Sequence, residues 1–185
     1  VDSSKPLVLM VQHPVTTAAE KAGQQMTETL EAVTATGHPV ILVYPNADAG
    51  GRRMIEILKD YEKRYTSIKA LKSLPRREYL GLMKVASVLV GNSSSGMIDA
   101  PSFGLPVVNI GTRQRGRVRA RNVIDVGYAR EEIVDGIEKA VAPQFRGALD
   151  GLSSPYGVGN ASEVIVRRLK ELPLDNRLAS KVFFD

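Results

Sequence analysis

The chain has 185 residues, of which 43% are hydrophobic and 24% are charged, a composition typical of one globular domain with a sizeable core. It has no apolar run near about 18 residues, no cysteine and two histidines, which argues against a membrane span, a disulfide or a structural zinc site and fits the cytoplasm. The net charge of +5 is local, because residues 112–121 hold five of the 25 basic residues and no acid, so we expect no nucleic acid among the partners.

Apolar runs typical of buried strands recur along the chain, with helical segments between them. The predicted strands are 7–11, 40–43, 67–71, 85–90, 107–110 and 123–126. The predicted helices are 17–35, 52–65, 76–84, 131–141 and a last one that begins near residue 160. Because the strands are continuously apolar and alternate with helices, we expect an α/β fold with a doubly wound parallel sheet, covered on both faces.

Polar residues follow four of the predicted strands. His13 comes after the first strand, Asn46 after the second, residues 92–96 after the fourth and Arg113 after the fifth. The carboxyl ends of parallel strands meet at one edge of the sheet, and ligands bind there near the switch in strand order. We therefore expect these four segments to form one site.

The serine turn, residues 91–96 (Gly-Asn-Ser-Ser-Ser-Gly), precedes a short predicted helix. It lacks the Gly-Lys-Ser/Thr ending of a P-loop and the Gly-x-Ser-x-Gly spacing of a nucleophile elbow. Ser93 or Ser94 could cap the helix, and the same hydroxyls and backbone N–H groups could bind an anion at the positive end of the helix dipole. Together with the arginines that follow, the turn predicts a site for a diphosphate.

The arginine loop, residues 111–121, carries an arginine at every second position from Arg113 onward. Alternate residues of an extended segment share one side, and unpartnered guanidinium groups repel one another, so some of them must face solvent. We expect Arg113 to bind the anion, with Gly111 and Gly116 letting the backbone fold closely around it. The arginines expected to form a solvated loop are Arg115, Arg119 and Arg121.

Two titratable residues near these segments each allow two interpretations. His13 precedes Pro14, and it is either a hydrogen-bonded loop residue or a group that titrates near neutrality and exchanges protons with a substrate. Asp99 either binds a ribose diol or is an ordinary acid near a helix start. Asp48, close to Asn46, has no second carboxylate at metal-ligand spacing, so we predict no metal and no cofactor.

The carboxyl-terminal part is less regular. Residues 144–159 are rich in glycine and serine and predict a loop, and Asn160 is the expected cap of the last helix. The tail, residues 173–185, has no predicted partner within the chain. The residues of the last helix that are expected to face inward are Val164, Ile165 and Leu169.

Motifs along nearly the whole chain, residues 7–172, resemble those of the UDP-N-acetylglucosamine 2-epimerases. The matching segments are Gln12-His13-Pro14-Val15-Thr16-Thr17, Tyr44-Pro45-Asn46 with Asp48-Ala49-Gly50, the block 90–126, and Pro155-Tyr156-Gly157 with Gly159-Asn160-Ala161-Ser162. The Gln-His-Pro-Val-Thr form resembles the hydrolysing branch, which feeds sialic acid synthesis. The non-hydrolysing branch usually has His-Arg followed by acids at that place.

The resemblance implies a glycosyltransferase-B-like architecture, in which a nucleotide-sugar binds between two Rossmann-like halves. This chain would be the carboxyl-terminal half, one nucleotide-sugar-binding domain over residues 1–185 that starts with a linker at 1–6. The amino-terminal half, with the carboxylates that act on the sugar, would be absent. The full-length enzyme would be a homodimer.

The resemblance also implies roles for individual residues. His13 would be catalytic, and Asp99 stands where the family usually has a glutamate at the ribose hydroxyls. The other expected UDP contacts are Asn46, Ser93, Ser94 and Arg113.

The implied reaction is the elimination of UDP from UDP-N-acetylglucosamine, followed by addition of water to the resulting glycal. The products would be UDP and N-acetylmannosamine, and the chain on its own would be inactive. Two alternatives stay open from the residues: a non-hydrolysing 2-epimerase, and a nucleotide-sugar-binding module of a glycosyltransferase.

Overall fold

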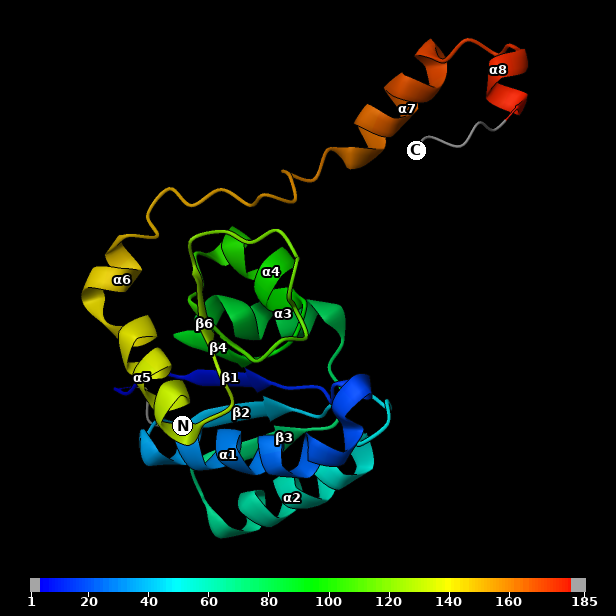
Figure 1. Ribbon diagram of the computed structural model, residues 1–185. Helices are drawn as coiled ribbons and strands as arrows, with labels where there is room; N and C mark the ends of the chain where they lie inside the picture. The colour runs from blue at the N-terminus through cyan, green and yellow to red at the C-terminus, as the bar shows by residue number, and fades with distance from the viewer. Residues whose placement is uncertain (1–3, 181–185) are drawn as a thin grey trace. The chain divides into compact units, whose positions relative to one another are not determined.

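A computed structural model describes residues 4–180, and it contains a parallel sheet with helices packed around it (Figure 1). The strands are β1 (Val8–Val11), β2 (Val40–Val43), β3 (Ile68–Leu71), β4 (Val88–Gly91), β5 (Val107–Ile110) and β6 (Val123–Val126). The helices are η1 (Thr16–Lys21), α1 (Ala22–Ala35), α2 (Gly51–Arg64), α3 (Arg76–Val85), α4 (Ser95–Ile98), η2 (Ala100–Phe103), α5 (Arg130–Val141), α6 (Pro143–Gly147), α7 (Ala161–Glu171) and α8 (Asn176–Ala179). Among the described residues, none of these helices combines the length and apolarity that a bilayer crossing needs.

The sheet has the strand order β3-β2-β1-β4-β5-β6, and every neighbouring pair is parallel. The chain moves outward from β1 to β3, returns to place β4 beside β1, and then moves outward in the other direction. The switch in strand order therefore lies between β1 and β4. This is the doubly wound α/β arrangement that the alternating pattern predicts.

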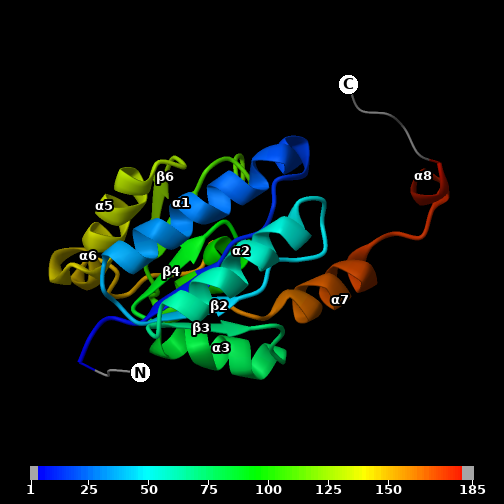
Figure 2. The ribbon, with the colours of Figure 1, turned by 90° about the horizontal axis from the view of Figure 1, so that it is seen from below.

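Both faces of the sheet are covered, because the strands carry apolar side chains on both sides. In β1, Val8 and Met10 pack into a core that includes residues of α1, α2 and α5, whereas Leu9 and Val11 pack with residues of α3 and η2. On the first face, α1 contacts both α2 and α5 (Figure 2). The period-2 alternation of a strand thus divides one apolar run between two cores.

Several boundaries differ from the predicted ones. The fourth strand begins at Val88 rather than Val85, because Val85 ends α3 and an apolar run alone does not distinguish the end of a helix from the start of a strand. The first helix is preceded by the separate 3-10 segment η1. The predicted loop at 144–159 contains most of α6, which starts with a proline at its first position.

The chain divides into two compact units between Pro155 and Tyr156, within the range that the sequence analysis treats as one domain. In the second unit, Asn160 occupies the N-cap position of α7, as predicted, but its side chain makes no capping hydrogen bond. Every residue of α7 is exposed, so this unit by itself does not bury the residues that were expected to face inward, Val164, Ile165 and Leu169. A segment this short has too few residues to cover a helix face by itself.

The predicted tail has structure in part. Within it, the structure describes residues 173–180, which include α8, and residues 181–185 lie outside the described part.

Candidate diphosphate site

The four predicted segments meet at the carboxyl edge of the sheet, around Asn92, which directly follows β4. The backbone N–H of Asn92 donates to Val11 O at 3.1 Å, and its side chain exchanges two hydrogen bonds with the backbone of His13, at 2.7 and 2.8 Å. Its carbonyl oxygen accepts from Arg113 Nη1 at 3.1 Å and from Gln114 Nε2 at 2.8 Å. Asn92 is fully buried, so it joins β1, the serine turn and the arginine loop into one unit.

Asn92 belongs to the segment 92–96 that was predicted at this edge, but its buried linking role, and the role of Gln114, were not predicted. The position of Asn92 immediately after a buried strand is a signal that could have singled it out, because a buried amide must find hydrogen-bond partners. Gln114 carries no comparable signal, since its role depends on a contact with a residue 22 positions away.

The approach of β4 to β1 requires glycine at position 91. Gly91 has a φ of +133°, and a Cβ atom added to it would lie 2.1 Å from Val11 O. No L side chain fits at that distance, so the glycine allows the serine turn to begin directly against the end of β1.

His13 is held as a neutral imidazole. The backbone N–H of Asn46 donates to His13 Nδ1 at 3.1 Å, which assigns the proton of the neutral ring to Nε2. Burial, and secondarily the charge of Arg113, lower the pKa of His13 from 6.5 to about 4, against a smaller opposing effect of Asp48. The prediction that His13 titrates near neutrality is therefore wrong, because its surroundings disfavour the imidazolium.

Asn46 lies beside His13, as the convergence of the strand ends predicts. Its Nδ2 donates to Asp48 Oδ2 at 2.6 Å, and its Oδ1 is buried without a hydrogen-bond partner among residues 4–180. An unpaired buried oxygen is costly, so this atom can accept a hydrogen bond from a bound molecule.

The serine turn presents donors that the protein does not use itself. Within the described residues, the backbone N–H groups of Ser93 and Ser94 make no hydrogen bond. The Ser93 and Ser95 hydroxyls are 2.9 Å apart, and the Tyr79 hydroxyl lies 2.6 Å from Ser95 Oγ. The helix that follows, α4, has four residues, so its dipole contributes little, and the donor groups of the turn itself provide the attraction for an anion.

Asp99 directly follows α4, three residues after the serine turn. Its Oδ1 accepts from Arg76 Nη2 at 3.1 Å, and its side chain is 19% exposed. Arg76 is the first residue of α3. The structure thus places Asp99 near the serine turn but gives it a protein partner, so a ribose diol would have to share this carboxylate with Arg76.

Arg113 is the arginine that reaches the serine turn, through the carbonyl of Asn92. Arg115 and Arg121 are exposed, as predicted, whereas Arg119 is partly buried, so the prediction of a solvated residue is wrong for Arg119. Arg119 pairs with Asp125 of β6 and donates to Gln114 O at 3.0 Å. Arg121 donates to Ala148 O at 2.9 Å and to Asp150 O at 2.8 Å. Both anchor the arginine loop to neighbouring segments, which sequence spacing alone does not show.

Gly111 has a different role from the predicted one. Its φ is +70°, and a Cβ atom would lie 2.1 Å from the Tyr128 ring. The space beside Gly111 is therefore occupied by an aromatic side chain, and the glycine serves the packing of the loop rather than the approach of a ligand.

A cavity of about 320 Å³ opens beside the segment that follows His13. It brings the Pro-Val-Thr-Thr segment and Asp48 opposite the start of the arginine loop. The lining residues are Pro14, Val15, Thr16, Thr17, Asp48, Thr112 and Arg113. Of the predicted site residues, Arg113 lines this cavity, which has room for part of a small polar molecule.

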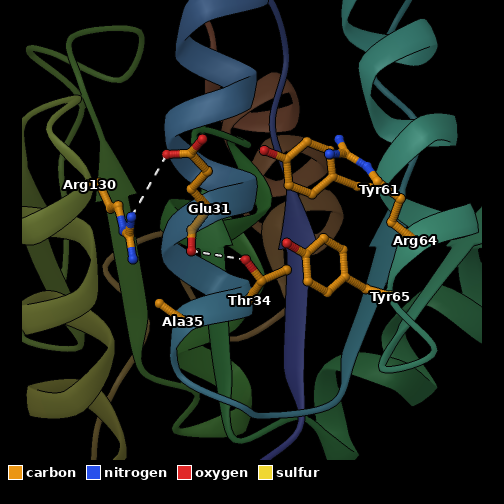
Figure 3. Close-up of a pocket in the computed structure, with 7 residues that line it drawn as sticks. All are labelled: Glu31, Thr34, Ala35, Tyr61, Arg64, Tyr65 and Arg130. Carbon is orange, nitrogen blue, oxygen red and sulfur yellow. Dashed lines mark hydrogen bonds and ion pairs between the residues drawn. The ribbon is translucent and has the colours of Figure 1, made fainter.

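A larger cavity, about 360 Å³, lies between α1, α2 and Arg130 of α5 (Figure 3). Its charged groups have partners: Arg130 Nη1 lies 4.0 Å from Glu31 Oε2, and the Arg64 guanidinium lies 4.4 Å from the centre of the Tyr61 ring. Tyr61 and Tyr65 stack with their ring centroids 5.6 Å apart. None of the predicted site residues lines it, so we assign this cavity to helix packing.

Comparison with known proteins points to one family. The family model for UDP-N-acetylglucosamine 2-epimerase matches residues 2–170. The chain is 34% identical over 181 residues to the hydrolyzing UDP-N,N'-diacetylbacillosamine 2-epimerase of Legionella pneumophila, covering 97% of this chain and 46% of that protein. It is also 34% identical over 187 residues to polysialic acid biosynthesis protein P7 of Escherichia coli, covering 98% and 46%. The chain thus spans about half the length of these curated relatives.

Solved structures share the fold. The UDP-GlcNAc 2-epimerase of Neisseria meningitidis, bound to UDP-GlcNAc, superposes with a TM-score of 0.75 at 20% identity, over 93% of this chain and 46% of that one. S. aureus MnaA, solved with UDP, gives 0.72 at 22% identity, over 90% and 45%. These matches confirm the predicted Rossmann-like fold class, and the extent of the family match leads to one conclusion: the chain belongs to the UDP-N-acetylglucosamine 2-epimerase family.

Proposed function

We propose that this chain is the UDP-binding, carboxyl-terminal half of a hydrolysing UDP-N-acetylglucosamine 2-epimerase. The observation that carries the proposal is the set of hydrogen bonds around Asn92, which joins His13, the serine turn and Arg113 at the switch between β1 and β4. A switch point of this kind is where doubly wound sheets bind nucleotides.

The diphosphate of UDP fits the donors at this corner. The free backbone N–H groups of Ser93 and Ser94 and the Ser94 hydroxyl point to no protein partner within residues 4–180. Arg113 uses Nη1 to hold Asn92 O, and its remaining N–H groups can bind a phosphate oxygen. Donors fixed in place before the reaction stabilise the charge that builds up on the departing diphosphate.

The proposed reaction breaks two bonds of the sugar and then forms two. A base removes the proton on C2 while the C1–O bond breaks, and UDP leaves with the bonding electron pair. Water then adds across the C1–C2 double bond of the glycal. Its hydroxyl joins C1, and a proton joins C2 on the face opposite the one from which the base removed the original proton. The product is N-acetylmannosamine.

His13 takes part as a donor rather than as the base in this scheme. Its Nδ1 is occupied by the Asn46 N–H and its pKa is lowered to about 4, so at neutral pH the ring offers an Nε2 proton to the substrate. The base that acts on C2 would belong to the other half of the enzyme, as the family resemblance implies.

The remaining proposals concern the acceptor residues, the identity of the sugar, and the location and assembly of the full-length enzyme. Asn46 Oδ1 and the Asp99 carboxylate are the proposed acceptors for sugar or ribose hydroxyls. The sugar is N-acetylglucosamine or a diacetamido sugar, since a relative at 34% identity is named for diacetylbacillosamine. We further propose a cytoplasmic homodimer for the full-length enzyme.

Calorimetric titration of the chain with UDP and with uridine tests the proposal. We expect UDP to bind, and uridine to bind at least tenfold more weakly because it lacks the diphosphate, a difference of about 1.4 kcal/mol or more. The Arg115→Ala variant, changed at an exposed arginine of the same loop, should bind UDP like the wild type. Absence of both heat and a thermal shift at millimolar UDP would exclude this function.

A further inference from the structure

The Tyr79 hydroxyl is part of a chain of hydrogen bonds that ends at the serine turn. It lies 2.6 Å from Ser95 Oγ, which lies 2.9 Å from Ser93 Oγ, and the Ser95 N–H also donates to Ser93 Oγ at 3.4 Å. Tyr79 belongs to α3, whereas the serines follow β4, so this hydroxyl chain (Tyr79, Ser95, Ser93) connects two segments.

The direction of the hydrogen bonds decides what Ser93 can do. A serine hydroxyl has one proton and two acceptor lone pairs. If Tyr79 donates to Ser95, the proton of the buried Ser95 hydroxyl has no acceptor other than Ser93 Oγ among residues 4–180, so Ser95 donates to Ser93. The two lone pairs of Ser93 then accept from the hydroxyl and the N–H of Ser95. The only remaining capacity of Ser93 is its own proton, which must then point away from the hydroxyl chain. In the opposite direction, the Ser93 hydroxyl would donate its proton to Ser95 Oγ and would have none left for a ligand.

The chemistry of the phenol favours the first direction. A phenol, with an ordinary pKa near about 10, is a stronger donor and a weaker acceptor than an aliphatic hydroxyl. Burial raises the pKa of Tyr79 further, so the phenol keeps its proton at neutral pH. Ser95 is itself buried, at 8% exposure, which limits competition from water.

We propose that Tyr79 is a positioning residue, whose hydroxyl directs the Ser93 proton, through Ser95, toward the diphosphate of UDP. The proposal rests on the proposed function, because it assigns a direction to one donor of the same site. It adds a residue that touches neither phosphate nor sugar.

Tyr79→Phe removes one oxygen from the hydroxyl chain and keeps the ring. We expect UDP to bind about 3- to 10-fold more weakly, the range for one hydrogen bond, while the affinity for uridine stays unchanged. Ser95→Ala interrupts the hydroxyl chain in the middle and should give the same selective loss. Tyr61→Phe, a change in the helix-packing cavity, is the matched control and should leave UDP binding unchanged.

A double-mutant cycle with Ser93→Ala separates positioning from general loosening of the structure. If Tyr79 acts through Ser93, then Tyr79→Phe has no further effect in the Ser93→Ala background. Equal losses for UDP and uridine, full additivity with Ser93→Ala, or unchanged UDP affinity in both Tyr79→Phe and Ser95→Ala would overturn the role of Tyr79 while the wild type still binds UDP. A wild-type chain that does not bind UDP would overturn the proposed function itself, and this proposal with it.

Discussion

Individual residues at the carboxyl edge have two tasks, since several of them hold the site together and also face the proposed ligand. Arg113 shows both, because one N–H fixes the Asn92 carbonyl and the others remain for an anion. His13 is similar: its backbone and Nδ1 bind the protein, and Nε2 carries the free proton. The hydrogen bonds within the protein therefore fix the directions in which these residues can bind the proposed ligand.

Arg113→Ala should weaken UDP binding by about 1.5–3 kcal/mol, the range for a charge-assisted hydrogen bond. Titration calorimetry measures the change, with Arg115→Ala as the control on the same loop. A loss below about 0.5 kcal/mol in Arg113→Ala would place Arg113 outside the site.

The lowered pKa of His13 predicts a pH-dependent stability. Between about 6.5 and 4 the unfolded state binds a proton that the folded state does not, so the free energy of unfolding falls as the pH falls through this range. For a group that keeps some solvent contact, the full loss is up to about 3 kcal/mol, complete below pH 4. Above pH 6.5 neither state binds this proton, so His13 no longer makes the free energy of unfolding depend on pH.

Urea unfolding at pH 7 and pH 4.5 tests this. His13→Asn keeps an acceptor near the position of Nδ1 and cannot titrate, so its stability should fall less between the two pH values than that of the wild type. His38→Gln is the control and should retain most of the fall. If His38→Gln removed most of the pH-dependent loss of stability and His13→Asn removed little of it, His13 would not be its source.

At the level of elements, the end of β4 depends on one backbone position. Gly91→Ala would place a methyl group 2.1 Å from Val11 O at a φ that disfavours side chains, and we expect a loss of about 3 kcal/mol or more in unfolding free energy. Gly81→Ala, in α3 with open space around it, should instead stabilise the protein by about 0.5–1 kcal/mol. Denaturant unfolding of both variants provides the measurement, and a Gly91→Ala protein as stable as the wild type would contradict the described turn.

Strands and their convergence could be predicted from the sequence, because buried parallel strands are continuous apolar runs and their carboxyl ends share an edge. The contacts that anchor the carboxyl end of the arginine loop could not be predicted, because the partner of Arg119 lies in β6 and those of Arg121 follow α6. The hydroxyl chain could not be predicted for the same reason, because Tyr79 and Ser95 are 16 positions apart and meet only in the folded chain.

For the whole molecule, the composition predicted one globular domain, and the fold carries the predicted site within the unit that ends at Pro155. The exposed apolar residues of α7 show the limit of such reasoning, because a helical pattern indicates which side is apolar and not what covers it. The family resemblance, rather than composition, connected the site to a reaction.

The chain spans about half the length of its curated relatives, which leads to a prediction about activity. We expect it to bind UDP but to release neither UDP nor N-acetylmannosamine from UDP-N-acetylglucosamine, because the proposed base lies in the other half. Mass spectrometry of the reaction mixture checks this. Turnover by the chain alone would show that His13 or another residue described above acts as the base.

A crystal structure of the chain with UDP tests the central claim most directly. We predict that the diphosphate lies at the serine turn, with oxygens within hydrogen-bond distance of the Ser93 and Ser94 N–H groups and the Arg113 guanidinium. A nucleotide seated elsewhere, such as in the cavity between α1 and α2, with this corner of the sheet vacant, would contradict the account.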